Sequence, residues 1–191
     1  HPIRFNFDLH RVSGFYSAVI VFVVTFTGVY IVYPQYIKPA IKIFSPIEEN
    51  LKNITSQRES ESSTIPIETA LSMANKVFPN AELMAIGLPL DKKDTYRIYK
   101  RQKGEVRKSK GKSVVWIDQY SANIIKIKDP NNMSAGETFV NWQFPLHTGE
   151  AFGMFGRLLV FFSGIATTVL VITGTIIWYR KKRMKYLKLL K

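Results

Sequence analysis

The chain has 191 residues, 46% of them hydrophobic, and its 27 lysines and arginines outnumber its 14 acidic residues, which gives a net charge of +13. Cysteine is absent, so disulfide-stapled folds and thiolate metal sites are excluded. Ten of the basic residues lie in or beside two long apolar runs, and the other 17 lie between the runs together with 12 of the 14 acids. This balanced distribution argues against a nucleic-acid-binding protein.

Two runs of 22 residues contain no charge, VSGFYSAVIVFVVTFTGVYIVY at 12–33 and LLVFFSGIATTVLVITGTIIWY at 158–179. At a helical rise of about 1.5 Å per residue, each run can cross a hydrocarbon core of roughly 30 Å. A cleaved signal peptide is the alternative for the first run, but the run is longer than a signal-peptide core and has no small-residue cleavage site at its end. The sequence therefore predicts transmembrane helices at 12–33 and 151–179.

Basic residues beside the two runs predict the orientation of the chain. Arg4 and Arg11 lie in the N-terminal flank 1–11, and the tail 180–191 is basic without an acid. Because positive charge marks the cytoplasmic side, we expect both termini in the cytoplasm and the central domain in the periplasm or outside the cell. The expected location is the bacterial inner (cytoplasmic) membrane, where the tail acts as a topology anchor and touches anionic lipid.

Between the membrane helices, residues 34–64 are interpreted as an exit segment along the interface, interrupted by prolines, followed by a polar linker. Residues 65–128 predict a small α+β domain, with a helix at 65–79 and strands at 82–90, 94–101, 113–118 and 123–128. Residues 129–150 are a return segment. The domain contains no histidine, and its basic hairpin at 100–112 is interpreted as a solvated loop, with attraction of an anionic ligand or lipid headgroups as the alternative.

Two histidines lie at the ends of the membrane helices, His10 before the first apolar run and His147 before the second. On a helix, Gly14, Ser17 and Gly28 fall within about 40° of His10, which suits close helix packing or a flat cofactor. A stripe of small residues on the second helix is interpreted as the helix contact, with His147 facing something else. Its members are Gly149, Gly153, Gly156, Ser163, Thr167 and Gly174.

A histidine at a membrane rim can simply extend to the headgroups, but neutral imidazole is also an axial ligand of haem iron. We expect Asp8 and Glu150 to be candidates for the groups that orient the two imidazoles. Because His10 and His147 are expected on opposite faces of the membrane, roughly 30 Å apart, they cannot bind one iron. If both bind haem, each needs a partner histidine from elsewhere.

The segment RFNFDLHRVSGFYSAVIVFVVTFTGVYIVYP resembles the first helix, with Asp-Leu-His-Arg and Thr-Gly, of the PepSY-associated transmembrane proteins. PLHTGEAFGMFGRLLVFFSGIATTVLVITGTIIWYRKKR resembles the closing helix of that family, and residues 65–128 are similar to a PepSY domain. The family's usual Asp-Pro-x-Thr-Gly turn is replaced here at 119–123. The resemblance implies the C-terminal half of a longer, iron-regulated membrane protein of the ferric-siderophore reductase type.

The resemblance further implies two b-type haems per complete protein, with His10 and His147 each sharing one haem with a histidine outside this chain. The missing N-terminal half or a second protomer would supply that histidine. Electrons would pass from an unidentified donor across the lipid bilayer to a ferric siderophore, which the PepSY-like domain would cover or dock. The alternatives are a non-catalytic, membrane-anchored PepSY module that binds or regulates an extracytoplasmic partner, and a structural subunit of a transporter.

Overall fold

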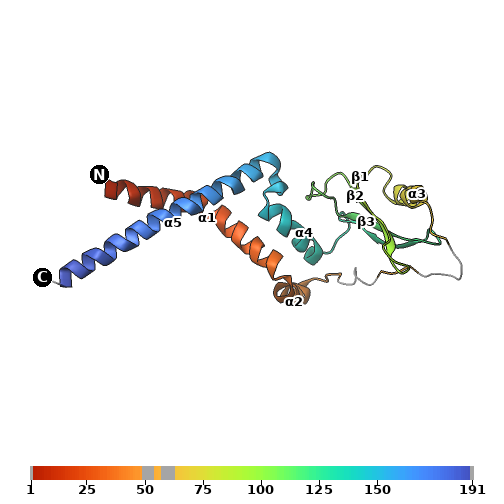
Figure 1. Cartoon of the computed structure of the whole chain (residues 1–191), viewed down its shortest axis with the longest axis horizontal. Coiled ribbons are helices and arrows are strands. Elements are labelled where there is room, and N and C mark those ends of the chain that lie inside the picture. Colours follow the sequence, from red (N-terminus) through yellow and green to blue (C-terminus); the bar gives the residue numbers. More distant parts are fainter. Residues whose placement is uncertain (1, 49–53, 57–62, 190–191) are drawn as a thin grey trace. The chain divides into compact units, whose positions relative to one another are not determined.

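The computed structural model describes residues 2–48, 54–56 and 63–189, and most of the predicted linker lies outside these ranges. The chain forms two compact units. The helical unit comprises residues 1–32 and 143–191, and the sheet unit comprises residues 33–142. Figure 1 shows the helices and strands of both units, which are described separately below.

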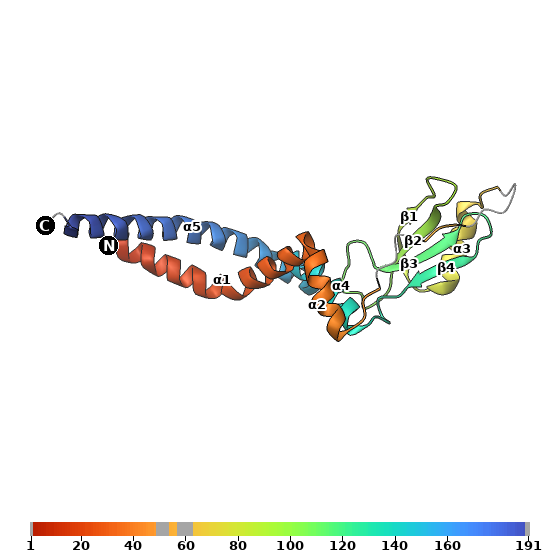
Figure 2. The ribbon, with the colours of Figure 1, turned by 90° about the horizontal axis from the view of Figure 1, so that it is seen from below.

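The helical unit is built on α1 (Pro2–Val32) and α5 (Gly153–Leu189). The two helices lie side by side in Figures 1 and 2 and run antiparallel, since His10 near the start of α1 meets Gly174 near the end of α5. Both are long and apolar enough to cross a membrane, over Arg4–Val32 and Glu150–Leu187. The prediction of two membrane helices is confirmed, but each helix continues beyond its apolar run into the expected flank or tail.

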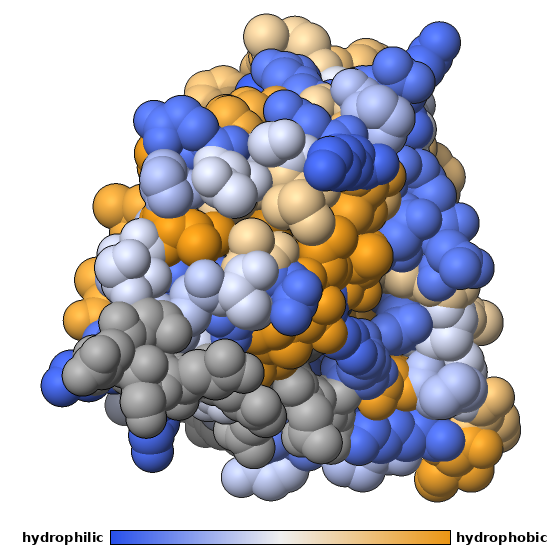
Figure 3. Space-filling view, turned by 90° about the vertical axis from the view of Figure 1, so that its right-hand side faces the viewer, coloured by the Kyte–Doolittle hydropathy of each residue, from blue (hydrophilic) through white to orange (hydrophobic). Residues whose placement is uncertain are grey.

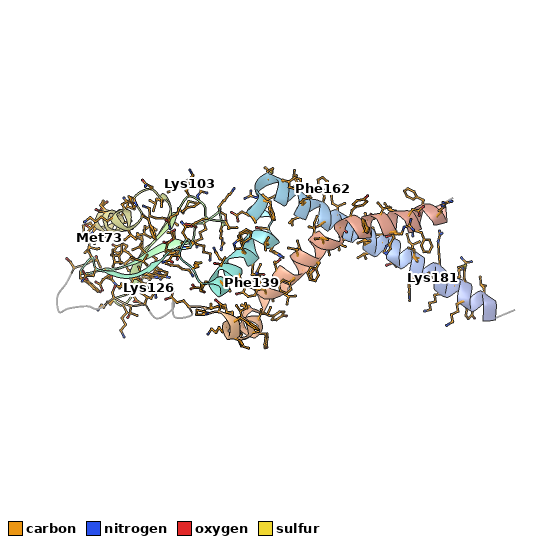
Figure 4. All side chains as sticks on the ribbon, turned by 180° about the vertical axis from the view of Figure 1, so that it is seen from behind. Met73, Lys103, Lys126, Phe139, Phe162 and Lys181 are labelled. Atoms are coloured by element: carbon orange, nitrogen blue, oxygen red, sulfur yellow. The ribbon has the colours of Figure 1, made fainter. Side chains whose placement is uncertain are left out.

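Large apolar side chains on α1 and α5 point outward, as Phe162 does in Figure 4. A core helix of a soluble protein would bury such side chains, whereas a membrane helix leaves them to the lipid. The residues between the helices are small or hydroxylated instead. A Cβ on Gly14 would lie 3.4 Å from Leu170, and Ser17 and Ser163 are buried with their hydroxyls bonded to carbonyls of their own helices.

The sheet unit contains α3 (Ile67–Val77) and an antiparallel sheet of order β1-β2-β3-β4. Its strands are β1 (Glu82–Gly87), β2 (Thr95–Arg101), β3 (Ser113–Asp118) and β4 (Ile124–Lys128). The predicted helix and four strands are confirmed. In Figure 3 the sheet unit presents hydrophilic residues on both sides of a hydrophobic strip.

Alternation along the strands gives the sheet one core face. Ile98 of β2 and Val115 and Ile117 of β3 pack on the helix residues Ala70 and Ala74. The intervening residues of these strands occupy the opposite face of the sheet, because successive strand side chains point to opposite sides. α3 therefore covers only one face.

Lys100 is buried on the core face at 2% exposure. Its ammonium donates to the Phe78 carbonyl at 2.5 Å and to the Asn75 side chain at 2.7 Å, both at the C-terminal end of α3. A cation at this end of a helix satisfies carbonyls that have no partner within the helix. Burial nevertheless lowers the pKa of Lys100.

The last hairpin forms although its turn departs from the family's usual residues. The Asp118 carboxylate accepts the backbone N–H groups of Tyr120 at 2.8 Å and Ser121 at 2.9 Å. Ala122 follows with φ 61°, in the left-handed region that favours glycine. The turn is therefore closed by a side chain at the cost of strain at one alanine.

The segments expected to be irregular on either side of the sheet contain two further helices. The exit segment forms α2 (Pro34–Phe44), because Pro34 occupies the first turn, where its missing N–H has no helical partner, and Pro39 does not end the helix. The return segment contains α4 (Ala135–His147), and a 3-10 turn, η1 (Glu150–Phe152), begins at its last residue. Within the sheet unit, the Gly136 N–H donates to the Ser45 hydroxyl at 2.8 Å.

Candidate functional site

His10 on α1 packs against a Thr-Gly pair on α5. Its Nδ1 lies 2.8 Å from the Thr173 hydroxyl oxygen, and its Cε1 would lie 3.3 Å from a Cβ placed on Gly174. The hydroxyl of Thr173 itself donates to the Val169 carbonyl at 2.7 Å. Since its only proton is used there, the hydroxyl oxygen accepts the Nδ1–H of His10.

His147, at the end of α4, packs against a Thr-Gly pair on α1 in the same way. Its Nδ1 lies 3.0 Å from the Val24 carbonyl and 3.2 Å from the Thr27 hydroxyl. A carbonyl can only accept, so Nδ1 must carry the proton. A Cβ on Gly28 would lie 3.1 Å from Cε1 of the imidazole, so a glycine at this position leaves room for the ring.

Both imidazoles therefore use Nδ1 as the donor into the opposite helix. In neutral imidazole the other nitrogen, Nε2, then carries the lone pair that can bind a metal. A hydrogen bond from the second ring nitrogen is what fixes the tautomer and direction of a ligating histidine. The helix pair thus fixes two imidazoles, at two places, through Nδ1, and Nε2 takes no part in these hydrogen bonds.

The two places are at opposite ends of the helix pair. Between His10 and Thr27, α1 rises by about 26 Å at 1.5 Å per residue. This spacing agrees with the expectation from the sequence that the two histidines lie about a membrane thickness apart and do not share one metal ion.

His147 is held by a glycine-dependent turn rather than by α5 itself. Gly149 has φ 74°, which L side chains rarely adopt, and the chain then turns through η1 into α5. A Cβ on Gly156 would overlap the Gly149 carbonyl oxygen and would also lie 2.9 Å from Phe152 Cβ. The close approach of Gly149 and Gly156 brings the end of α4 against α1.

The two membrane helices share a sequence pattern that matches the two similar contacts. Residues 11–33 and 157–179 align without a gap, and both contain Arg, Phe, Ser, Thr-Gly and Tyr at the same spacing. The aligned Thr27 and Thr173 bond to the aligned carbonyls of Val23 and Val169, both at 2.7 Å. Because α1 and α5 are antiparallel, this is an inverted repeat, in which each Thr-Gly pair receives a histidine at the opposite end.

The position of α5 that aligns with His10 is Gly156. Gly156 has no side chain, and the turn at Gly149 packs on it. His147, which precedes this turn, makes the contact with Thr27 that corresponds to the contact of His10 with Thr173. The repeat could have been found from the sequence, since Thr-Gly occurs near the end of both apolar runs. It identifies Thr27 and Thr173, which the sequence analysis missed as orienting residues.

A cavity of about 450 Å³ lies beside His10. Its walls include Phe7, Ile177 and Trp178, and its rim carries two cations, Arg11 and Lys181. Apolar walls with a few convergent polar groups are typical of cofactor and small-molecule sites. The cavity therefore offers an imidazole, flat apolar surfaces and positive charge within one site.

The small residues expected under His10 lie in two different places. Gly14 and Ser17 lie at the contact between α1 and α5, whereas Gly28 lies against His147 rather than under His10. The expectation that His147 faces away from the helix contact is wrong, because it bonds to α1.

Asp8 and Glu150 do not occupy the orienting positions expected of them. Asp8 lines the cavity beside His10 and pairs with Arg4 at 3.9 Å, but the partner of His10 Nδ1 is a threonine. Glu150 is buried at 2% exposure, and His147 Nδ1 bonds to Val24 and Thr27. Within residues 2–48, 54–56 and 63–189, no group of three or more His, Asp or Glu side chains could hold a metal ion.

Comparison with known proteins agrees with this architecture. A family model described as the PepSY-associated TM region matches residues 1–181, which is nearly the whole chain. A comparison with curated proteins finds no match.

Proposed function

The chain belongs to the PepSY-associated transmembrane family, and from that membership and its paired imidazoles we propose that it is the haem-binding module of a membrane reductase. In this proposal the module passes electrons across the bilayer to an extracytoplasmic ferric siderophore. The observation that carries it is the pair of histidines at opposite ends of the helices, each donating through Nδ1 and keeping Nε2 for a ligand. A histidine that merely extends to lipid headgroups needs no such partner.

The residues beside His10 fit a haem. His10 would bind the iron, Phe7 and Trp178 would supply apolar surface, and Arg11 and Lys181 would supply positive charge for carboxylates beside the acid Asp8. A bound b-type haem would supply the one-electron redox chemistry. At the other end His147 would be the ligand. Among the described residues each site offers one histidine, so its second ligand would come from a histidine outside this chain or from a second protomer.

The basic residues support an orientation in which both termini are cytoplasmic. Arg4 and Arg11 at the start of α1 and Arg180 to Arg183 near the end of α5 lie at the same end of the antiparallel pair. In a bacterial inner membrane, His10 would then lie near the cytoplasm and His147 near the outer face. The sheet unit would be extracytoplasmic.

A ferric siderophore is a suitable acceptor on chemical grounds. Hard oxygen ligands hold Fe(III) mainly through its charge, so reduction to Fe(II) weakens the chelate and releases the iron. The electron donor on the cytoplasmic side is unidentified. As a reductase, this protein would serve iron uptake rather than transport the chelate itself.

Optical spectra of the purified protein test the proposal. Protein expressed with ample haem should show a split Soret and α-band after reduction with dithionite. His10→Ala and His147→Ala should each remove about half of the haem, whereas Thr168→Ala on the exposed face of α5 should remove none.

Inserted, folded protein without haem under the same conditions would contradict the proposal. It would favour the alternative of a non-catalytic membrane anchor for the PepSY-like domain, which has its own hydrophobic core. Growth on a ferric siderophore that is unaffected by either histidine substitution would likewise favour a structural role.

A further inference from the structure

A second cavity, of about 360 Å³, lies on the sheet face that α3 leaves uncovered. β2 contributes Arg97 and Tyr99, β3 contributes Trp116 and β4 contributes Lys128. Cross-strand pairing holds these side chains together, since Arg97 is opposite Trp116, and Val114 lies between Tyr99 and Lys128. The strands thus provide a floor with aromatic rings and two cations.

The hairpin between β2 and β3 adds three more cations, Arg107, Lys110 and Lys112. Lys110 lies with its ammonium 4.8 Å from the centre of the Tyr99 ring, a cation–π contact. The hairpin therefore extends over the outer face of the sheet and closes one side of the cavity.

Residues 103, 104 and 108–110 of this hairpin are exposed, as expected of a solvated loop, but the hairpin also has a buried centre. Its centre is Glu105, which is 7% exposed and accepts the N–H of Gln102 at 2.8 Å, the N–H of Lys112 at 2.6 Å and the hydroxyl of Ser113 at 2.6 Å. A buried carboxylate with several donors is a strong local constraint. The cations of the hairpin are thereby fixed beside the cavity.

The hairpin is also anchored to β2. Arg101 donates to the Lys108 carbonyl at 2.6 Å. Gly111 adopts φ 66° directly against the backbone of Lys100, where a Cβ would overlap the Lys100 carbonyl. Only glycine fits at position 111, so this residue determines how closely the hairpin approaches β2.

The cavity has a surplus of positive charge. Among the described residues, five cations and no acid line it, while Asp94 pairs with Arg97 at 2.9 Å and Glu105 accepts the Lys112 N–H. Burial and then the positive charges of Arg107, Lys128 and Lys110 lower the pKa of Lys112 to about 8, although Glu105 acts in the opposite direction. An anion placed among these groups would relieve their mutual repulsion.

We propose that this cavity binds a small polyanion rich in anionic oxygens, held by Arg107, Lys112 and Lys128 and bordered by Tyr99 and Trp116. Guanidinium and ammonium groups in a fixed arrangement are the donors that recognise carboxylates and similar oxyanions. The volume lies within the range of about 300–1,000 Å³ found for small-molecule sites. A concave site with aromatic walls favours a small molecule over the flat surface of a membrane.

The proposal that the polyanion is an iron chelate rests on the proposed function. The proposal that the cavity binds an anion does not depend on it. If the module reduces ferric chelates outside the cytoplasm, the cavity selects those that carry several carboxylates over neutral hydroxamate chelates. The cavity would then be the docking site that the sheet unit contributes to the reductase.

Isothermal titration of the full chain in an uncharged detergent tests the site, with citrate and ferric citrate as probes. Saturable binding is expected. Lys112→Gln and Lys128→Gln should each weaken it about tenfold, the loss expected for one charged contact of about 1.4 kcal/mol. The matched control is Lys103→Gln, because Lys103 is exposed at the edge of the sheet unit on the same hairpin and does not line the cavity. Figure 4 labels this residue.

The pH dependence gives a second readout. Wild-type affinity for citrate should fall between pH 7 and 9 as Lys112 loses its proton. The other charged groups of the cavity are Arg97, Arg107, Lys110 and Lys128. The acids beside it are Asp94, paired with Arg97, and Glu105, bonded to the Lys112 N–H. Lys112→Gln should show a flatter profile. An equal slope in wild type and variant would contradict the assignment of Lys112 to the site.

The site is overturned if neither citrate form binds saturably, or if Lys103→Gln weakens binding as much as the cavity variants. Binding only to vesicles that contain anionic lipid, reduced by the cavity variants, would overturn the small-molecule ligand in favour of a headgroup. Citrate binding by protein that contains no haem would keep the anion site and reject the reductase. Haem binding without citrate binding would keep the reductase and reject the anion site.

Discussion

Substitution of Gly156 by alanine tests whether the turn at the end of α4 sets the position of His147. A Cβ at this position would lie 2.9 Å from Phe152 Cβ and 3.1 Å from the Gly149 carbonyl carbon, and closer still to that carbonyl's oxygen. Two of these atoms are backbone and cannot rotate away. The turn and α5 would therefore have to separate.

The required movement exceeds what the histidine contact can absorb. Carbon atoms pack at about 3.5–4.0 Å, so the Phe152 contact alone requires a movement of about 0.6–1.1 Å, and the closer Gly149 carbonyl oxygen requires at least as much. The bond from His147 Nδ1 to the Val24 carbonyl is 3.0 Å long. A shift of that size takes it beyond the roughly 3.2 Å limit of an ordinary N–H···O bond. Overpacking of this kind costs about 1–3 kcal/mol of stability.

Nitrogen-15 spectra of histidine-labelled protein provide the assay, because ring ¹⁵N shifts report which imidazole nitrogen carries the proton. In Gly156→Ala the His147 signals should change while those of His10 stay as in the wild type. Gly164→Ala is the matched control in the same helix, since a Cβ there meets nothing within 4 Å. Unchanged His147 signals and equal thermal stability of the two variants would refute the role of the turn.

Three further substitutions have defined outcomes. Thr173→Val should remove the acceptor of the His10 Nδ1–H, cost about 1 kcal/mol in chemical unfolding and mix the imidazole tautomers in the ¹⁵N spectrum, unlike Thr168→Val on the exposed face. Lys112→Met should raise the free energy of unfolding at pH 7 by up to about 3 kcal/mol, because the pKa of Lys112 is about 8 in the folded chain and about 10.5 in the unfolded chain. Wild-type stability should rise from pH 8 to 10.5, since only the unfolded chain still holds this proton there. A variant that retains this rise would contradict the assignment. Ala122→Gly should relieve the strain of φ 61° and raise the free energy of unfolding by about 0.5–1 kcal/mol, which urea titration measures; a loss would exclude strain at this turn.

Hydrophobic patterns were sufficient to predict those helices and strands whose structure depends mainly on their own residues. The two charge-free runs gave the membrane helices, and the alternation in 94–101 and 113–118 gave two central strands, because periodicity records which face of an element is buried. The exit segment at 34–44 was misread, since prolines usually interrupt a helix but fit in its first turn. The hydrogen bonds inside the basic hairpin were not predicted, because they depend on a single buried carboxylate, Glu105.

The sequence by itself determined that two helices cross the membrane, that a small α+β domain lies between them and that a histidine precedes each apolar run. Only the tertiary structure decided that His10 meets Thr173 and that His147 meets Thr27 and Val24. These partners are more than 100 residues apart in the chain, and hydrophobic periodicity fixes the faces of a helix but not which helix covers them. The cavity on the sheet arose in the same way, from charges on three strands and a hairpin that local patterns cannot bring together.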